Sequence, residues 1–135
     1  MKVAIFIGTY VPGFRGGGPV ASVARLVADE TGHQVRVVTS DRDFGDSAPY
    51  AVAVSRAWVS LEGTQVAYLR SGFRDFFWAL RAIREWGPSV VYLNGLHATD
   101  TLAVLVARKL GLVPRRALVL APRGEASEGA REVKR

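Results

Sequence analysis

The chain has 135 residues, of which 49% are hydrophobic and 22% charged, a length and balance that fit one folded domain and exclude a disordered chain. It has no cysteine and two histidines, which excludes a disulfide scaffold, a zinc ribbon, a thiol nucleophile and a His-rich metal centre. The net charge of +6 comes mainly from arginine, whose forked guanidinium suits an anionic partner. No apolar run is long enough to span a membrane.

A buried strand and a helix are predicted at the start of the chain. Residues 3–8 are a continuous apolar run rich in β-branched and aromatic side chains, which is typical of a strand covered on both faces of a parallel sheet. Residues 9–18 contain four glycines after the strand and predict a loop. Pro19 then begins a segment with apolar residues at helical spacing, and Gly32 ends it.

The middle of the chain predicts three more strands and a second helix. Residues 34–39 form a second buried strand, and residues 50–58 and 64–70 form two weaker β segments. Residues 72–86 are helical and are followed by a Gly-Pro stop. The face of this helix expected to be buried carries mainly aromatic side chains: Phe73, Phe76, Phe77, Leu80 and Ile83.

The last elements complete an alternation of strands and helices. Residues 89–93 and 117–121 predict buried strands, and residues 99–110 predict an apolar helix between them. Such alternation requires parallel βαβ units with right-handed crossovers. We therefore expect an α/β fold with a Rossmann-like open, mostly parallel sheet and helices on both faces.

A ligand is expected where the strand order of such a sheet reverses, beyond the carboxyl ends of the strands. The first loop there carries Gly16, Gly17 and Gly18 directly before a helix, so that backbone N–H groups and the helix dipole can face an anion. A plain flexible turn is the alternative. The segment lacks the glycine spacing of nicotinamide-binding and P-loop proteins. Asp41 lies where a ribose-binding acid would follow the second strand, but without that glycine spacing we interpret it as part of a polar turn.

Two further loops carry polar candidates on the same edge. Asn94 and His97 follow the strand at residues 89–93, which places an amide and a titratable ring at the reversal point. Arg123 and Glu125 follow the last strand and could hold a polyol or a phosphate. A structural histidine and an exposed ion pair are the corresponding alternatives.

The helix at residues 72–86 also has an unusual polar stripe. Trp78 stands among Arg74, Arg81 and Glu85 on the side opposite the phenylalanines. A basic helix with an interfacial tryptophan can lie on an anionic bilayer. The alternative is that Trp78 is covered by arginine stems or by a neighbouring loop.

The chain resembles the N-terminal half of a GT-B glycosyltransferase of the large retaining family 4. Four segments in the family's order carry the resemblance, and together they span the chain. They are residues 2–13 with the glycines before Pro19, residues 34–43, residues 90–97, and residues 121–130 with the sequence Ala-Pro-Arg-Gly-Glu-Ala-Ser-Glu-Gly-Ala, followed by Lys134 and Arg135.

This resemblance implies metal-free transfer of a sugar, with retention of configuration, from a nucleotide-diphosphate sugar to a glycan or a lipid-linked acceptor. No cofactor is implied. Matched by position, Gly16, Gly17 and Gly18 approach the donor diphosphate and the acceptor, and His97 faces the donor sugar as the catalytic-site residue. Asn94, Arg123 and Glu125 line the cleft.

The resemblance also implies that residues 1–135 are the acceptor-side domain and that a second, nucleotide-sugar-binding domain lies outside them. We therefore expect an isolated domain that folds but is nearly inactive alone, and that self-associates through its uncovered interface. A stand-alone α/β nucleotide-binding or regulatory module is the alternative function. Nucleic-acid binding is disfavoured because the basic residues are scattered. A cytoplasmic location is expected, and peripheral contact with the inner face of the membrane stays open.

Overall fold

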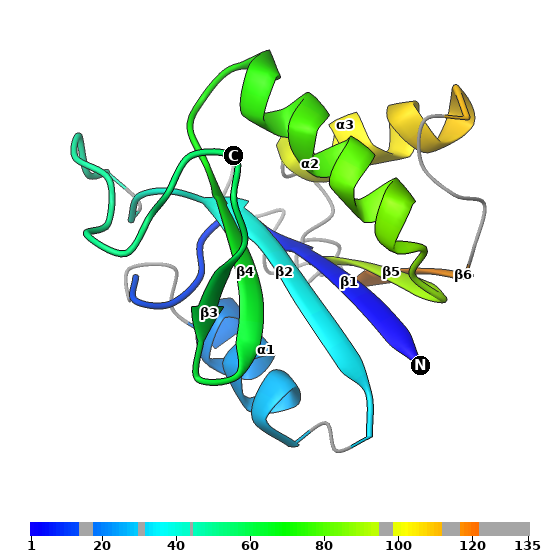
Figure 1. Cartoon of the computed structure of the whole chain (residues 1–135), viewed down its shortest axis with the longest axis horizontal. Helices are drawn as coiled ribbons and strands as arrows, with labels where there is room; N and C mark the ends of the chain where they lie inside the picture. Colours follow the sequence, from blue (N-terminus) through cyan, green and yellow to red (C-terminus); the bar gives the residue numbers. More distant parts are fainter. Residues whose placement is uncertain (14–17, 30–31, 44, 95–98, 112–116, 122–135) are drawn as a thin grey trace, which may run out of the picture.

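Six strands form one open sheet in the order β3-β4-β2-β1-β5-β6 (Figure 1). The computed structural model describes residues 1–13, 18–29, 32–43, 45–94, 99–111 and 117–121. All neighbouring strands run parallel except β3, which is antiparallel to β4 at one edge. The strands are β1 Lys2–Ile7, β2 Gln34–Ser40, β3 Val59–Leu61, β4 Thr64–Leu69, β5 Val90–Asn94 and β6 Ala117–Ala121.

Helices cover both faces of this sheet, as predicted (Figure 1). Helix α1, Gly18–Asp29, packs on one face, where Val23 joins Val37 and Tyr68 in a buried cluster. Helices α2, Phe73–Trp86, and α3, Thr99–Lys109, pack on the other face. The fold is therefore a Rossmann-like α/β sheet with three helices.

The central strands are buried on both faces, and this explains their apolar sequences. In β1, Ala4 and Phe6 belong to the cluster beneath α2 and α3, whereas Ile5 and Ile7 belong to the cluster beneath α1. Successive side chains of a strand point to opposite faces. A strand with a helix layer on each side must therefore be apolar at every position, as the run at residues 3–8 indicated.

Glycines lie at both ends of helix α2. Gly72 is the N-cap residue and Gly87 caps the C-terminus in the left-handed conformation, with its N–H donating to the carbonyl of Ile83. The predicted buried face is wrong at two positions, because Phe73 is 79% exposed and Phe77 is 54% exposed. The first turn of α2 extends beyond the carboxyl ends of the strands (Figure 1), so the sheet does not cover these rings.

The predicted β segment at residues 50–58 is also wrong. This stretch is a loop in which the Ala53 N–H donates to the carbonyl of Tyr50 and Arg56 has a positive φ of 50°. Its two large aromatics pack on opposite faces of the sheet, Tyr50 against the cluster beneath α1 and Trp58 against the cluster beneath α2. Their partial burial, and not strand pairing, accounts for these two aromatics, whereas Val52 and Val54 of the same segment are exposed.

The tryptophan of the polar stripe is covered. The Trp78 ring lies 5.8 Å from the ring of Trp58, centroid to centroid, and packs against the core beneath α2. The alternative in which a neighbouring loop covers Trp78 is therefore the one observed. Within the described residues, no helix is both long enough and apolar enough to cross a bilayer.

Candidate functional site

The strand order reverses between β1 and β5, which is where the ligand site was predicted. Strand β1 pairs with β2 on one side and with β5 on the other. The strands that follow β1 are therefore added on one side of it as far as β4, and β5 and β6 are added on the other side. The carboxyl ends of β1 and β5 meet at Ile7 and Asn94, which are partners in the register. Of the predicted site residues, Asn94 is thus at the reversal point.

Two polar side chains lie on the α1 face at this edge. Asn94 is 6% exposed and follows Tyr92 by two positions, so it points to the same face as Tyr92, toward α1. Thr39 is paired with Tyr68 and shares that face. The Thr39 Oγ1 atom is buried and has no hydrogen-bond partner among the described residues. A buried hydroxyl without a partner is costly, so a polar group is expected against it.

The predicted glycine site is described only at its end. Gly18 is the first residue of α1, so the glycine segment leads directly into a helix that starts on the face of Asn94 and Thr39. Gly16, Gly17 and His97 lie outside the described residues, and so do Arg123 and Glu125. Their roles stay predictions.

The first part of the loop after β1 is held by tyrosines from other elements. The Tyr68 hydroxyl donates to the carbonyl of Val11 at 2.7 Å, and the Tyr50 hydroxyl donates to the carbonyl of Tyr10 at 3.5 Å. Burial, with the nearby Tyr10 and Tyr50, raises the pKa of Tyr68 to about 12. The sequence contained no local signal for this arrangement, because the tyrosines come from separate segments.

Gly13 lies where these groups converge. A Cβ at this position would collide with the Tyr50 hydroxyl, lie 2.9 Å from the Tyr10 carbonyl oxygen and lie 3.1 Å from Asp43 Oδ1. The loop can therefore approach its neighbours this closely only with glycine. Close packing fixes the backbone of residues 10–13, which precedes the predicted anion-binding segment.

A cleft of about 470 Å³ opens at the carboxyl edge on the other face of the sheet. It lies between the ends of β2 and β4, the start of α2 and the side of α3. Its rim carries Arg42, Arg70 and Ser71, which follow the ends of β2 and β4. The remaining lining is largely apolar and includes Phe6, Val38, Leu69, Phe73, Phe76 and Ala103.

An ion pair fixes one wall of this cleft. The backbone N–H of Arg70 donates to Asp75 Oδ2 at 3.0 Å, and the Arg70 guanidinium donates to both carboxylate oxygens, at 3.3 Å and 3.5 Å. The Arg56 Nε atom lies 3.9 Å from Oδ1. Burial opposes ionisation of Asp75, but the hydrogen bonds from Arg70 and the charges of Arg70 and Arg56 outweigh it and lower the pKa of the carboxyl. The end of β4 is thereby tied to the first turn of α2.

A second ion pair orients Arg42 on the opposite rim. The guanidinium donates to Asp41 at 2.8 Å and 3.4 Å and to the carbonyl of Ser47 at 2.7 Å. Asp41 is buried, and its own N–H donates to the carbonyl of Leu69. Its carboxylate is therefore engaged in the turn after β2, in agreement with the interpretation of Asp41 as a turn residue.

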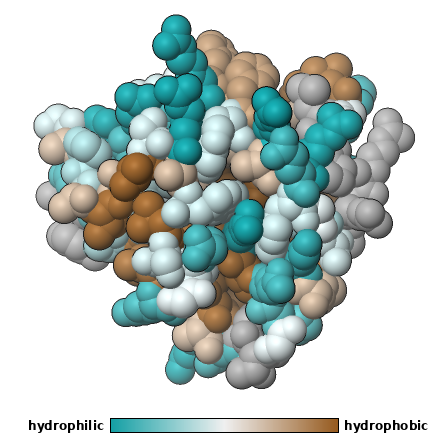
Figure 2. Space-filling view, viewed as in Figure 1, coloured by the Kyte–Doolittle hydropathy of each residue, from teal (hydrophilic) through white to brown (hydrophobic). Residues whose placement is uncertain are grey.

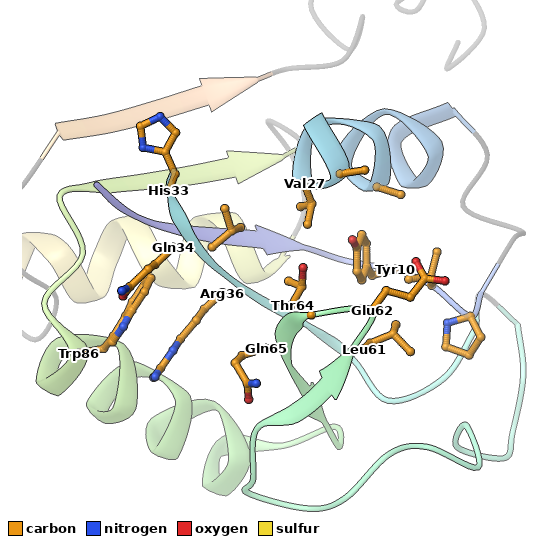
Figure 3. Close-up of a pocket in the computed structure, with 16 residues that line it drawn as sticks. Tyr10, Val27, His33, Gln34, Arg36, Leu61, Glu62, Thr64, Gln65 and Trp86 are labelled. Atoms are coloured by element: carbon orange, nitrogen blue, oxygen red, sulfur yellow. The ribbon is translucent and has the colours of Figure 1, made fainter. Parts of the chain in front are cut away.

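A larger cavity of about 700 Å³ lies between α1 and the turn that joins β3 to β4, and its lining runs from the loop after β1 to the amino ends of β2 and β4 (Figure 3). Val27 of α1, Leu61 at the end of β3 and Glu62 of the turn line it. A doubly wound fold usually places a helix after its second strand, whereas here a loop and the short β3 connect β2 to β4. The cavity follows from that difference, because no helix fills the space beside α1.

Beside this cavity, Arg36 is stacked between two tryptophans. Its guanidinium carbon lies 4.8 Å from the Trp58 ring centroid and 4.6 Å from that of Trp86, and Figure 3 shows Arg36 and Trp86 side by side. Lys2 donates to the carbonyl of Trp86 at 2.9 Å. These contacts join β1, β2 and the end of α2, which is a structural role.

The described residues contain no group of three or more His, Cys, Asp or Glu side chains that could hold a metal ion. The carboxyl edge thus combines two features, the buried polar side chains Asn94 and Thr39 on the α1 side and an arginine-rimmed apolar cleft on the α2 side. Comparisons with protein-family models, with curated proteins and with solved structures found no match to this chain.

Proposed function

We propose that this domain binds the acceptor in a retaining glycosyltransferase of the GT-B type, which transfers a sugar from a nucleotide-diphosphate sugar to a glycan or a lipid-linked acceptor. The observation that carries the proposal is the position of the arginine-rimmed cleft at the carboxyl edge, beside the reversal of strand order at Ile7 and Asn94. The resemblance of the sequence to retaining family 4 enzymes supports the same function.

The chemistry of the cleft suits an acceptor with both apolar and polar parts. Phe76 and Leu69 offer apolar contacts to an aglycone or to a sugar face, and Arg42 and Arg70 offer donors to hydroxyl or phosphate oxygens. On the α1 side, we assign Gly16, Gly17 and Gly18 to the donor diphosphate. His97 is assigned to the donor sugar, and Asn94, Arg123 and Glu125 to the edge of the cleft.

The position of Asn94 supports the polar side of this assignment, because Asn94 ends β5 where the strand order reverses. In the proposed enzyme, the second Rossmann-like domain supplies most of the contacts to the nucleotide. This domain therefore binds the acceptor and contributes the glycines that face the diphosphate. We expect residues 1–135 alone to bind the donor weakly.

A stand-alone nucleotide-binding module is the second candidate. The observation that favours it is the direct entry of the glycine segment into α1 at the reversal point, since backbone N–H groups at such a helix start bind phosphate in many nucleotide-binding proteins. Acceptor binding is not required for this function.

Chemical-shift titration of the 135-residue protein separates the two candidates. We expect octyl glucoside, added below its micelle concentration as an amphiphilic acceptor probe, to shift amides of Leu69, Phe76 and Ala103, and UDP-glucose or GDP-mannose to shift few amides, even at millimolar concentration. Micromolar binding of either nucleotide sugar, centred on Gly18 and Asn94, would favour the module. Octyl glucoside shifts confined to the cavity beside α1 would contradict the assignment of the cleft.

A further inference from the structure

The cavity beside α1 has the size and the lining of a small-molecule site. Its volume of about 700 Å³ lies within the range of about 300–1,000 Å³ that is usual for ligand pockets. Apolar side chains from four segments form its walls: Val11 of the loop after β1, Val27 of α1, Val35 of β2 and Leu61 of β3. The proposed sugar transfer does not use this cavity, because the arginine-rimmed cleft lies on the other face of the sheet.

The polar groups at one end of the cavity indicate which ligand it suits. Apolar walls alone do not, because apolar patches also lie among hydrophilic side chains on the face of the molecule seen in Figure 2. Tyr10 and Glu62 lie together at one end of the cavity, and His33 lies at the other (Figure 3). Burial and the nearby Glu62 charge both raise the pKa of Tyr10, so the carboxylate is close to the hydroxyl. Within the described residues, no lysine, arginine or histidine forms an ion pair with Glu62.

The backbone of Glu62 shows that the turn by itself favours a different residue. Glu62 and Gly63 are the two residues between β3 and β4, and their φ values are 50° and 84°. A two-residue hairpin turn with two positive φ values favours Asn, Asp or Gly at its first position, whereas glutamate is strained there. The turn therefore does not account for this glutamate, and a role for its carboxylate in the cavity does.

The arginine in the lining is already engaged elsewhere. The Arg36 guanidinium is stacked between Trp58 and Trp86, which pack against the core beneath α2, so its charge lies on the face opposite to Val35. The α1 side of the cavity thus combines an acidic end with apolar walls, in a chain whose net charge is +6. This combination suits a ligand with a positively charged head and an apolar body, since a carboxylate and a tyrosine side chain both attract an ammonium group.

We propose that this cavity binds a small organic cation, which carries an ammonium group on an apolar or aromatic body. The ammonium group donates to the Glu62 carboxylate beside Tyr10, and the body packs against Val27 and Leu61. Because Tyr10 belongs to the loop that leads to the predicted glycine segment, a bound cation would contact the start of that loop. The site goes beyond the proposed sugar transfer and does not depend on it.

Titration with three ligands of similar shape tests the preference for positive charge. Phenethylamine is a cation at pH 7, 2-phenylethanol is its neutral analogue and phenylacetate is an anion. We expect phenethylamine to bind with a Kd of about 1 mM, as its size allows, and to shift the amides of Val27, Leu61 and Thr64. 2-Phenylethanol should bind about fivefold more weakly, and phenylacetate should bind more weakly still. No shift of these amides at about 10 mM phenethylamine, or binding of either analogue as tight as that of phenethylamine, would overturn the proposal.

Two substitutions of Glu62 separate a ligand contact from a role in the turn. Glu62→Gln should weaken phenethylamine binding about fivefold. Glu85→Gln is the matched control, because Glu85 is exposed and lies outside the cavity lining, and it should bind as the wild type does. Glu62→Asn should also lose binding but raise the melting temperature by about 3 °C, since Asn suits this turn position. Wild-type affinity in Glu62→Gln, an equal loss in Glu85→Gln, or a Glu62→Asn variant less stable than the wild type would each refute the assigned role of Glu62.

A larger side chain at the rim of the cavity tests its location. Ala28 of α1 lines the cavity and is exposed, so Ala28→Phe should fill part of the space and weaken phenethylamine binding more than about tenfold without unfolding the helix. Ala21→Phe is the matched control, because Ala21 is also exposed on α1 but lies outside the lining. Wild-type affinity in Ala28→Phe would exclude the cavity as the site. Octyl glucoside binding at the cleft is measured separately, so failure of either proposal leaves the other standing.

Discussion

Replacement of Asp75 by alanine should destabilise the fold more than replacement of any surface ion-pair residue. The carboxylate is buried and accepts hydrogen bonds from the backbone and the guanidinium of Arg70. A hydrogen bond to a charged group contributes about 1.5–3 kcal/mol, but the exposed guanidinium is screened by water and adds little more. We therefore expect Asp75→Ala to lower the free energy of unfolding by about 2–3 kcal/mol, which corresponds to about 7–10 °C in melting temperature for a chain of this length.

Urea unfolding at several pH values measures this effect. The folded-state pKa of Asp75 lies below its unfolded value, so its stabilisation is complete above about pH 4 and is lost as the pH falls through the folded-state pKa. The gap between wild type and Asp75→Ala should therefore shrink in acid. Glu85→Gln is the control, because the Arg81–Glu85 pair is exposed and its loss should cost no more than about 0.5 kcal/mol. An Asp75→Ala variant as stable as Glu85→Gln, or a gap that is independent of pH, would refute the reasoning.

Three further predictions concern a glycine, a tyrosine and an arginine elsewhere in the fold. Gly13→Ala should lower the free energy of unfolding by about 1–3 kcal/mol, whereas Gly8→Ala, whose Cβ would meet nothing within 4 Å, should have little effect in the same denaturation assay. Burial raises the pKa of Tyr68 to about 12, above its unfolded value, so absorbance titration should show a tyrosine that ionises late, and Tyr68→Phe should remove this late step. The contribution of Tyr68 to the free energy of unfolding should be complete below about pH 10 and should fall as the pH rises toward the folded-state pKa. Arg36→Met should cost about 1–2 kcal/mol through loss of its stack with Trp58 and Trp86, and an equal cost for Arg25→Met would contradict this explanation.

The sheet and its helices could be predicted because each depends on local patterns. The apolar run at residues 3–8 and the glycines on either side of α2 carry enough information to place a buried strand and a helix. The errors arise where long-range contacts decide. The apolar residues at 50–58 resemble a strand, but the segment is a loop whose partly buried Tyr50 and Trp58 pack on opposite faces of the sheet.

For the candidate site, the sequence could predict where the strand order reverses, and the site itself stays a prediction. The rule for α/β sheets placed Asn94 at the reversal of strand order, and the register agrees. The cleft on the other face was missed, because no pattern in the sequence shows that the start of α2 extends beyond the sheet. Phe73 and Phe77 were misassigned to the core for the same reason: periodicity gives the apolar side of a helix but not the length over which the sheet covers it.

The pairing of β1 has a consequence for how the chain folds. Val3 pairs with Val35 on one side and with Val90 on the other, so the central strand is completed by a segment that is synthesised only after β2, β3 and β4. Until β5 arrives, a half-sheet of β1, β2 and β4 exposes an open β1 edge, the kind of edge that recruits strands from other chains. Pairings so distant in sequence also slow folding. The yield of soluble protein should therefore depend on how quickly β5 closes that edge.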